Sequence, residues 1–165
     1  MKFFEPGDIL LSDFDGVYLD SQNRFKKVMN NNSTLQEWME YLNSIKWYEF
    51  LRECEELPYA TETFLELQKL GILRGFITRI HSFEEGQEKC SFIREKGLIV
   101  PMYYVMPEQP KSEVYLPNKK VILLEDKYEN AEDWENKGGK SIVIDPNAEI
   151  ESNKKIKTLR KLLTK

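Results

Sequence analysis

Short apolar runs alternate along the chain with longer segments of helical periodicity. Residues 9–11 and 121–124 are apolar throughout, so a strand at either place would be apolar on both of its faces. Ile9 and Leu11 would lie on one face of the first strand, and Leu10 on the other. Strands that are apolar on both faces are typical of a covered, parallel sheet. Further strands are expected at 73–78, at 98–105, where a proline interrupts the run, and at 141–144.

Helices are expected between these strands. The segment 35–45 has apolar residues along one side of a helix, and either Ser33 or Thr34 would suit its N-cap. The other expected helices are 47–54, 61–70, 83–96, 128–136 and a basic helix at 150–163, with loops at 30–32 and at 107–117, the latter containing one helical turn. Strands that alternate with helices predict right-handed βαβ crossovers and therefore an α/β fold with a mainly parallel sheet.

The composition is that of an ordinary soluble protein. The 165 residues suit a single domain, and 41% of them are hydrophobic and 32% charged. No apolar stretch approaches the roughly 20 residues of a membrane span, and Glu5 and Pro6 interrupt the N-terminus too early for a secretory signal. Cys54 and Cys90 fit no disulfide or metal framework, so we expect buried, reduced thiols and a cytoplasmic protein. The net charge of -4 does not favour nucleic acid as a partner, and the oligomeric state is not indicated.

Two carboxylates follow the first apolar run. Asp13 and Asp15 stand one residue apart and are followed by Gly16. In an open parallel sheet, ligands bind at the carboxyl ends of the strands, which is where these acids would emerge. An Asp-Gly dipeptide is also a frequent turn sequence. The spacing alone therefore leaves a reactive pair and a simple turn both open.

The residues around this pair resemble a known motif. The run Asp13-Phe14-Asp15-Gly16-Val17, followed by Leu19-Asp20-Ser21, resembles the first motif of the haloacid dehalogenase-like (HAD) hydrolase superfamily, whose members are mostly Mg²⁺-dependent phosphatases. The resemblance implies a Rossmann-like, three-layer α/β/α fold in a single domain, 1–165, with a small helical cap inserted at about 18–60. It also implies that Asp13 is a nucleophile forming an aspartyl-phosphate, and that Asp15 is the general acid and base.

The ends of two other expected strands match further motifs. Thr78 ends the second strand, as in the second motif, where a hydroxyl binds the transferring phosphoryl group; alternatively, Thr78 caps the next helix. Glu125 and Asp126, with Asn130 four residues after Asp126, resemble the fourth motif. The resemblance implies a Mg²⁺ site formed by Asp13, the backbone carbonyl of Asp15, and Asp126. Glu125 stands where an aspartate is more usual, which leaves open whether it reaches the ion.

The third motif is a lysine whose spacing varies within the superfamily. Lys111, in the loop before the strand at 121–124, is our choice, with Lys119 and Lys120 as alternatives. Arg79 either contacts the substrate phosphate or lies on the surface. His81, the only histidine, is expected at the start of a helix or behind the site, because the mechanism does not require it.

The expected function is a Mg²⁺-dependent phosphatase acting on a small phosphorylated substrate. The paired acids with their asparagine and the small insert resemble the 5′-nucleotidase branch, so nucleotides are candidate substrates. Aromatic side chains of the insert could stack on a nucleobase, although core packing is the stronger expectation for most of them. These are Trp38, Tyr41, Trp47, Tyr48 and Phe50.

Two alternative functions remain open. A polynucleotide-end phosphatase could hold a strand with the basic side chains near the C-terminus. These are Lys154, Lys155, Lys157, Arg160, Lys161 and Lys165. A non-catalytic binding protein could use the same fold, since fold does not dictate function. The four matched residues Asp13, Asp15, Thr78 and Asp126 argue against that second alternative.

Overall fold

A single parallel sheet forms the centre of the protein. The computed structural model describes residues 3–30 and 32–164, and in these ranges six strands pair in the order β3-β2-β1-β4-β5-β6. Every pairing is parallel, which confirms the α/β class expected from the sequence. The strands are β1 Ile9–Ser12, β2 Leu73–Arg79, β3 Met102–Val105, β4 Val121–Glu125, β5 Lys140–Ile144 and β6 Lys155–Ile156.

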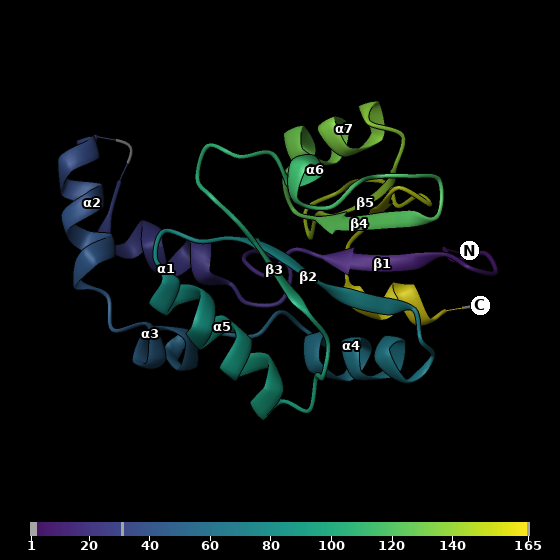
Figure 1. The fold of residues 1–165 in the computed structure, drawn as a ribbon, viewed down its shortest axis with the longest axis horizontal. Helices are drawn as coiled ribbons and strands as arrows, with labels where there is room; N and C mark the ends of the chain where they lie inside the picture. Colours follow the sequence, from purple (N-terminus) through teal and green to yellow (C-terminus); the bar gives the residue numbers. More distant parts are fainter. Residues whose placement is uncertain (1–2, 31, 165) are drawn as a thin grey trace.

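Helices cover both faces of the sheet and give three layers (Figure 1). One face carries α4 Ala60–Lys69, α5 Phe83–Glu95 and a 3₁₀ helix at Leu159–Leu163; the other carries α6 Lys111–Val114 and α7 Tyr128–Asn136. Because β1 is central, both of its faces must be apolar. Leu10 is fully buried in the larger cluster of the core, and Leu11 is fully buried in the smaller cluster with Ile77 and Trp134. This confirms the alternation expected for residues 9–11.

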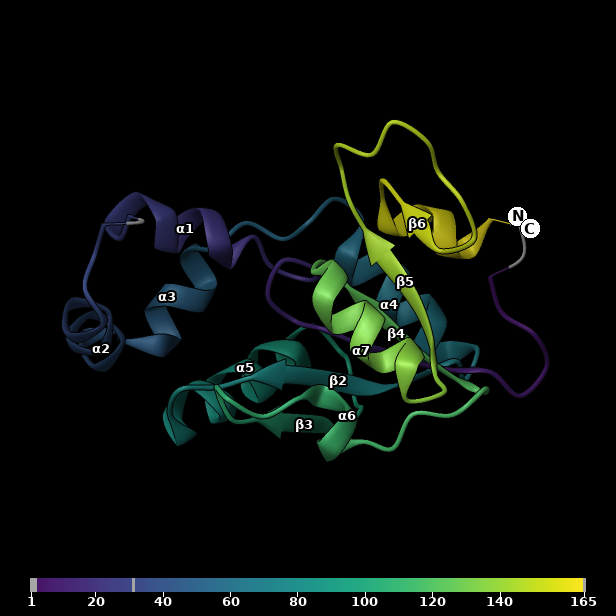
Figure 2. The ribbon, with the colours of Figure 1, turned by 90° about the horizontal axis from the view of Figure 1, so that it is seen from above.

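Three helices follow β1 and lie beyond the carboxyl ends of the strands (Figures 1 and 2). They are α1 Ser21–Val28, α2 Leu35–Ser44 and α3 Trp47–Glu53. Thr34, rather than Ser33, is the N-cap of α2 and forms a capping box with Glu37. No residue of α2 is fully buried, and Leu35 is 79% exposed. The apolar side of α2 is therefore only partly covered by the protein itself.

The C-terminal region does not form the basic helix expected at 150–163, so that prediction is wrong. Residues 155 and 156 instead form β6 at the edge of the sheet, where Asp145 N–H donates to the Ile156 carbonyl. The 3₁₀ helix after β6 packs against α4 through Leu159 and Leu162. Burial of these leucines and hydrogen bonding along β5 outweigh helix propensity, which is a weak prior.

Smaller differences concern boundaries and the cysteines. The strand expected at 98–105 begins only at Met102, after Pro101. Cys54 and Cys90 are free thiols, as expected, but both are half-buried rather than buried. Asn31 of the expected loop and Lys165 lie outside the described residues. In the described part of the chain, no helix is long and apolar enough to cross a membrane.

Candidate active site

The ends of three adjacent strands bring the candidate residues to one edge of the sheet. β1 lies between β2 and β4, so Asp13 follows the central strand, Thr78 is the last residue but one of β2, and Glu125 is the last residue of β4. The Asp13 N–H donates to the Leu124 carbonyl over 2.8 Å, which joins the end of β1 to the end of β4. The sheet order thus places groups more than 100 residues apart in sequence beside one another.

The turn after β1 needs a glycine for two reasons. Gly16 has φ +77, a left-handed conformation that side chains rarely adopt. A Cβ at this position would also collide with the carboxylate of Asp126 and the amide of Gln22. The Asp-Gly turn expected from the sequence is present, and it lets the β4 acid approach the turn that carries Asp13 and Asp15. The turn and the clustered acids are therefore compatible.

Lys111 is the lysine that reaches Asp13. It is the first residue of α6 and is 4% exposed, and its Nζ lies 2.8 Å from Asp13 Oδ2 and 2.6 Å from Glu125 Oε2. Burial alone would lower the pKa of Lys111, but the charges of Asp13 and Glu125 outweigh it and raise the pKa. Lys119 is exposed, and Lys120 pairs with acids near the N-terminus. Only Lys111 among the three candidates contacts the acid cluster.

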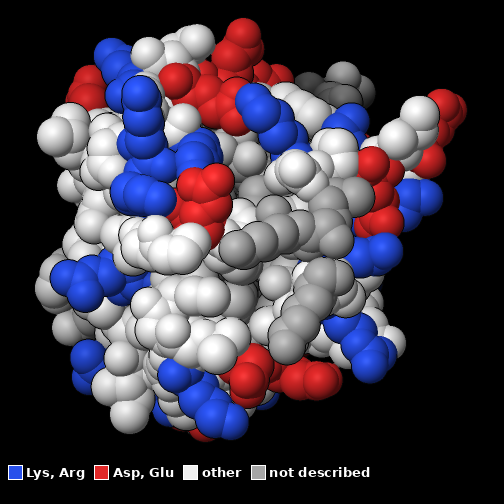
Figure 3. Space-filling model, turned by 90° about the vertical axis from the view of Figure 1, so that its right-hand side faces the viewer, with Lys and Arg blue, Asp and Glu red and all other residues white. Residues whose placement is uncertain are grey.

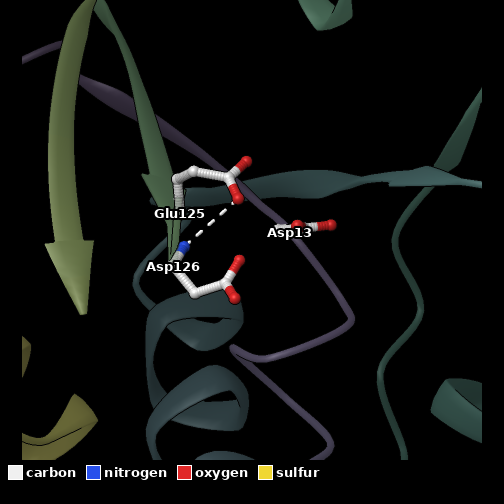
Figure 4. Close-up of side chains that lie close together, drawn as sticks. All are labelled: Asp13, Glu125 and Asp126. Atoms are coloured by element: carbon white, nitrogen blue, oxygen red, sulfur yellow. Dashed lines mark hydrogen bonds between the residues drawn. The ribbon is translucent and has the colours of Figure 1, made fainter. Parts of the chain in front are cut away.

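Three acids at this edge could hold a cation. Carboxylate oxygens of Asp13, Glu125 and Asp126 lie within 4.8 Å of one another (Figure 4). Asp126 Oδ1 is buried and has no hydrogen-bond partner, and an oxygen in that condition fits a metal ligand. Hard oxygen ligands are those that Mg²⁺ prefers. The residues present therefore fit a divalent cation.

The contacts of Glu125 differ from those of the other two acids. Its side chain is fully buried, and Oε2 accepts from Lys111 Nζ. Oε1 accepts from the backbone N–H of Asp126 over 3.2 Å (Figure 4) and from that of Lys127 over 3.3 Å. Both oxygens are thus already used within the protein. Glu125 orients Lys111 and the start of the following loop, whereas Asp126 has the free oxygen.

Mutual repulsion and burial shift the pKa values of the cluster. Burial, and next the charge of Glu125, raise the pKa of Asp13 to about 7, with Lys111 opposing them only in part. Burial and the Asp13 charge likewise raise the pKa of Asp126. A bound cation would favour the ionised forms of both acids. The electrostatics agree with the geometry in favouring a cation here.

Asp15 is held from two sides. Ser21, at the start of α1, donates to Asp15 Oδ1 over 2.6 Å, while Lys89 and Thr78 donate to Oδ2 over 2.6 Å and 3.3 Å. Burial would raise the pKa of Asp15, but the Lys89 charge and these hydrogen bonds outweigh it and lower the pKa. The hydroxyl of Thr78 is fully buried, and Ser82, not Thr78, is the N-cap of α5. The helix-cap alternative for Thr78 is therefore wrong.

Lys89 contacts Asp15 but was not predicted from the sequence. It is fully buried in α5, where Glu85, one turn earlier, lies 2.6 Å from its Nζ. Glu85 and Lys89 share the face of α5 that buries Phe92 and Ile93. An oppositely charged i, i+4 pair on the apolar side of a predicted helix was the available signal, because charges are rarely buried unless paired.

Arg79 and His81 also lie at the site. Arg79 Nη2 donates to the Gln109 carbonyl over 3.3 Å, while its Nε is buried without a partner. His81 precedes α5 and contacts Glu85 through its backbone N–H and, at 3.3 Å, through Nδ1. His81 thus takes the position at the start of a helix that was expected for it.

A cavity of about 240 Å³ opens above Asp13 and Asp15. One part of its wall is apolar and comes from the insert, with Phe25 of α1 and Trp38 and Leu42 of α2. Another part is polar and comes from the sheet edge. Its polar residues include Arg79, His81, Lys111, Lys127 and Asn130. Thr78 does not line the cavity, because it lies behind Asp15.

This fold, with acids following β1 and β4 and a helical insert after β1, is the HAD-like hydrolase fold. Solved structures of HAD-superfamily hydrolases share it. One from Ehrlichia chaffeensis has 15% identity and a TM-score of 0.55, with 99% of this chain and 100% of that chain covered. A HAD hydrolase of family IA, variant 3, from Entamoeba histolytica has 15% identity and a TM-score of 0.52, with 93% and 94% covered.

A mutant CbbY from Rhodobacter sphaeroides, in complex with xylulose-(1,5)bisphosphate, has 14% identity and a TM-score of 0.58, with 94% of this chain and 96% of that chain covered. No protein-family model and no curated protein sequence matches the chain. The likeness is one of fold, and it confirms the superfamily resemblance at that level.

Proposed function

We propose that the protein is a Mg²⁺-dependent phosphatase that hydrolyses a small phosphomonoester through an aspartyl-phosphate on Asp13. One observation carries the proposal: Lys111 is buried between Asp13 and Glu125, and the unpartnered oxygen of Asp126 lies in the same cluster. A structural ion pair does not need a third carboxylate beside it with one buried oxygen left without a partner. A reaction on a dianionic phosphoryl group needs positive charge beside the nucleophile, and here Lys111 supplies one such charge and the acids could hold a metal ion.

The residues suit a two-step displacement. A carboxylate oxygen of Asp13 attacks phosphorus, the ester P–O bond breaks, and the leaving oxygen receives a proton from Asp15. Water then attacks the phosphoryl group, its proton passes to Asp15, and the bond between Asp13 and phosphorus breaks to release phosphate. Lys111 offsets the negative charge on Asp13 and on the phosphoryl group.

Asp13 and Asp126 would hold Mg²⁺, together with the backbone carbonyl of Asp15. When bound, the ion would lower the charge repulsion between Asp13 and the substrate phosphate. Glu125 would support the site by orienting Lys111. Arg79, with its buried Nε unpartnered, is the residue best placed to contact a substrate oxygen from the polar wall.

The test is release of phosphate from a panel of phosphomonoesters, with Mg²⁺ and with EDTA. We expect activity that EDTA removes and that Asp13→Asn abolishes, by at least about 10³-fold, since the nucleophile is lost. Glu132→Gln, an exposed acid of α7, is the control and should keep full activity. Full activity of pure Asp13→Asn protein would contradict the assignment of the nucleophile.

A nucleoside monophosphate is the substrate that the cavity favours within this class. Trp38 and Phe25 offer half-buried aromatic surface, and a nucleobase stacked on an aromatic ring is worth about 1–3 kcal/mol. The panel should therefore include nucleotides, sugar phosphates and a phosphorylated oligonucleotide. Nucleotide hydrolysis in the cytoplasm also suits a protein with two free thiols.

At residues 150–163, the structure does not contain the basic C-terminal helix on which the polynucleotide-end phosphatase alternative depended. Lys154 instead pairs with Glu135, and Lys161 pairs with Glu151. On the face in Figure 3, the coloured Lys and Arg side chains are interspersed with Asp and Glu. No binding of an oligonucleotide at low salt is the expected result.

A further inference from the structure

We propose that Lys89, anchored by Glu85, is a positioning residue that holds the proton carrier Asp15 at the floor of the active site. The inference rests on the proposed phosphatase function and goes beyond it, because the mechanism above makes no use of α5. It assigns a role in the reaction to a buried ion pair beside the site, of which Glu85 also lines the cavity.

The contacts of Lys89 point to the site rather than to the core. Its Nζ lies 2.6 Å from Asp15 Oδ2, 3.2 Å from Thr78 Oγ1 and 2.9 Å from the Arg79 carbonyl. Three of its four partners therefore belong to the ends of β1 and β2, where the candidate catalytic groups lie. The fourth is Glu85, at 2.6 Å.

A fully buried lysine is costly to the fold unless its charge is compensated. Lys89 meets the charges of both Asp15 and Glu85, while Glu85 also accepts from the His81 N–H over 2.7 Å. The ammonium is thus fixed from α5, and a methionine could fill much of the same space without polar atoms. A role in packing alone does not account for the charge.

The contacts of Asp15 indicate that the positive charge of Lys89 fixes the orientation of the Asp15 carboxylate. Ser21 of α1 holds Oδ1, and Lys89 and Thr78 hold Oδ2, so the carboxylate bridges the helical insert and the sheet. Without Lys89, only the weaker contact at 3.3 Å would remain on Oδ2. Asp15 would then turn with Ser21, and its distance from the leaving oxygen would no longer be fixed. Misplacement of a catalytic group by about 1 Å can cost about 100-fold in rate.

The experiment compares leaving groups. p-Nitrophenyl phosphate needs little help from an acid, whereas an alkyl phosphate needs a proton on its leaving oxygen. We expect Lys89→Met to lower kcat/KM for the alkyl phosphate by about 100-fold and for p-nitrophenyl phosphate by less than about 5-fold. Asp15→Asn should show the same selectivity, and the double variant should be no worse than Asp15→Asn. Lys96→Met, at the C-terminal end of α5, is the matched control and should behave like the unaltered protein.

Equal losses for both substrates, or an additive double variant, would overturn the inference, because a purely structural role lowers all rates together. Should Lys89→Met fail to fold, Glu85→Gln is the test variant, since it keeps the Lys89 ammonium but removes the negative charge that anchors it. We expect this variant to shift selectivity in the same direction, by about 3- to 10-fold. Unchanged selectivity would contradict the proposal. Failure of the phosphatase function itself is distinguishable, because the unaltered protein would then release no phosphate from either substrate.

Discussion

At the scale of single residues, the acid cluster opposes the stability of the metal-free fold. Asp13 is buried close to Glu125 and Asp126, and its pKa is raised to about 7, above the ordinary value of 3.8. Between these two pH values the folded protein retains a proton that the unfolded chain has lost. The contribution of Asp13 to stability therefore falls as pH rises from about 4 to about 7 and is constant above that range.

Asp13→Asn should consequently stabilise the metal-free protein at pH 8, although it abolishes the proposed activity. We expect a gain of at least about 1 kcal/mol in the free energy of unfolding, since one pKa unit corresponds to about 1.4 kcal/mol. Urea denaturation at pH 5 and pH 8 measures this difference, with Glu132→Gln as the control. Mg²⁺ should stabilise the unaltered protein but stabilise the variant much less. A variant less stable than the unaltered protein at pH 8 would contradict the electrostatic account.

At the scale of elements, α2 combines an exposed position with an apolar side. It has a complete capping box and no fully buried residue, while Trp38 and Leu42 face the cavity. The helix therefore contributes little burial to the core and much of the apolar wall of the site. Substrate choice and global stability should be separable at this helix.

Trp38→Ala should weaken the binding of aromatic substrates and leave the fold nearly as stable. We expect KM for a nucleoside monophosphate to rise by about 5- to 150-fold, the equivalent of losing one stacking contact of about 1–3 kcal/mol. KM for a small sugar phosphate should change less. Met39→Ala, a substitution at a neighbouring residue that is 51% exposed, is the control. Equal effects on both substrates would show that Trp38 does not contact the base.

At the scale of the whole molecule, the C-terminal segment closes the core. Leu159 is fully buried and packs in the same cluster as Leu10 and Phe64, whereas the basic side chains around it point outward. Ile156 continues the sheet beyond β5. The charge in this segment is a solvated surface, and its leucines are structural.

Leu159→Ala should destabilise the protein by about 2–5 kcal/mol, because it removes a buried side chain and leaves a cavity. Arg160→Ala, whose side chain is exposed over the ring of Tyr59, should cost less than about 1 kcal/mol. Thermal or urea unfolding of the two variants tests this contrast. Similar stabilities for both would mean that the C-terminal segment does not pack as described.

The sequence predicted what depends on local pattern. Alternating apolar runs and helical periods indicated the parallel sheet, and the position of Asp13, Thr78 and Asp126 after strands indicated the edge at which they meet. It failed at 150–163, where a helical pattern gave way to an edge strand, because pairing with β5 is a contact between distant segments. Helical periodicity cannot report such a contact.

The sequence by itself determined the α/β fold class and the acids at the strand ends, because side-chain alternation and the parallel crossover rule fix both. Only the tertiary structure decided that Lys111, and not Lys120, forms the ion pair with Asp13. It also decided that Lys111 donates a hydrogen bond to Glu125 and that Lys89 donates one to Asp15. Each of these is a choice among partners far apart in the chain. The physical reason is that a buried charge must be compensated, and which opposite charge is near enough depends on how the strands and helices pack.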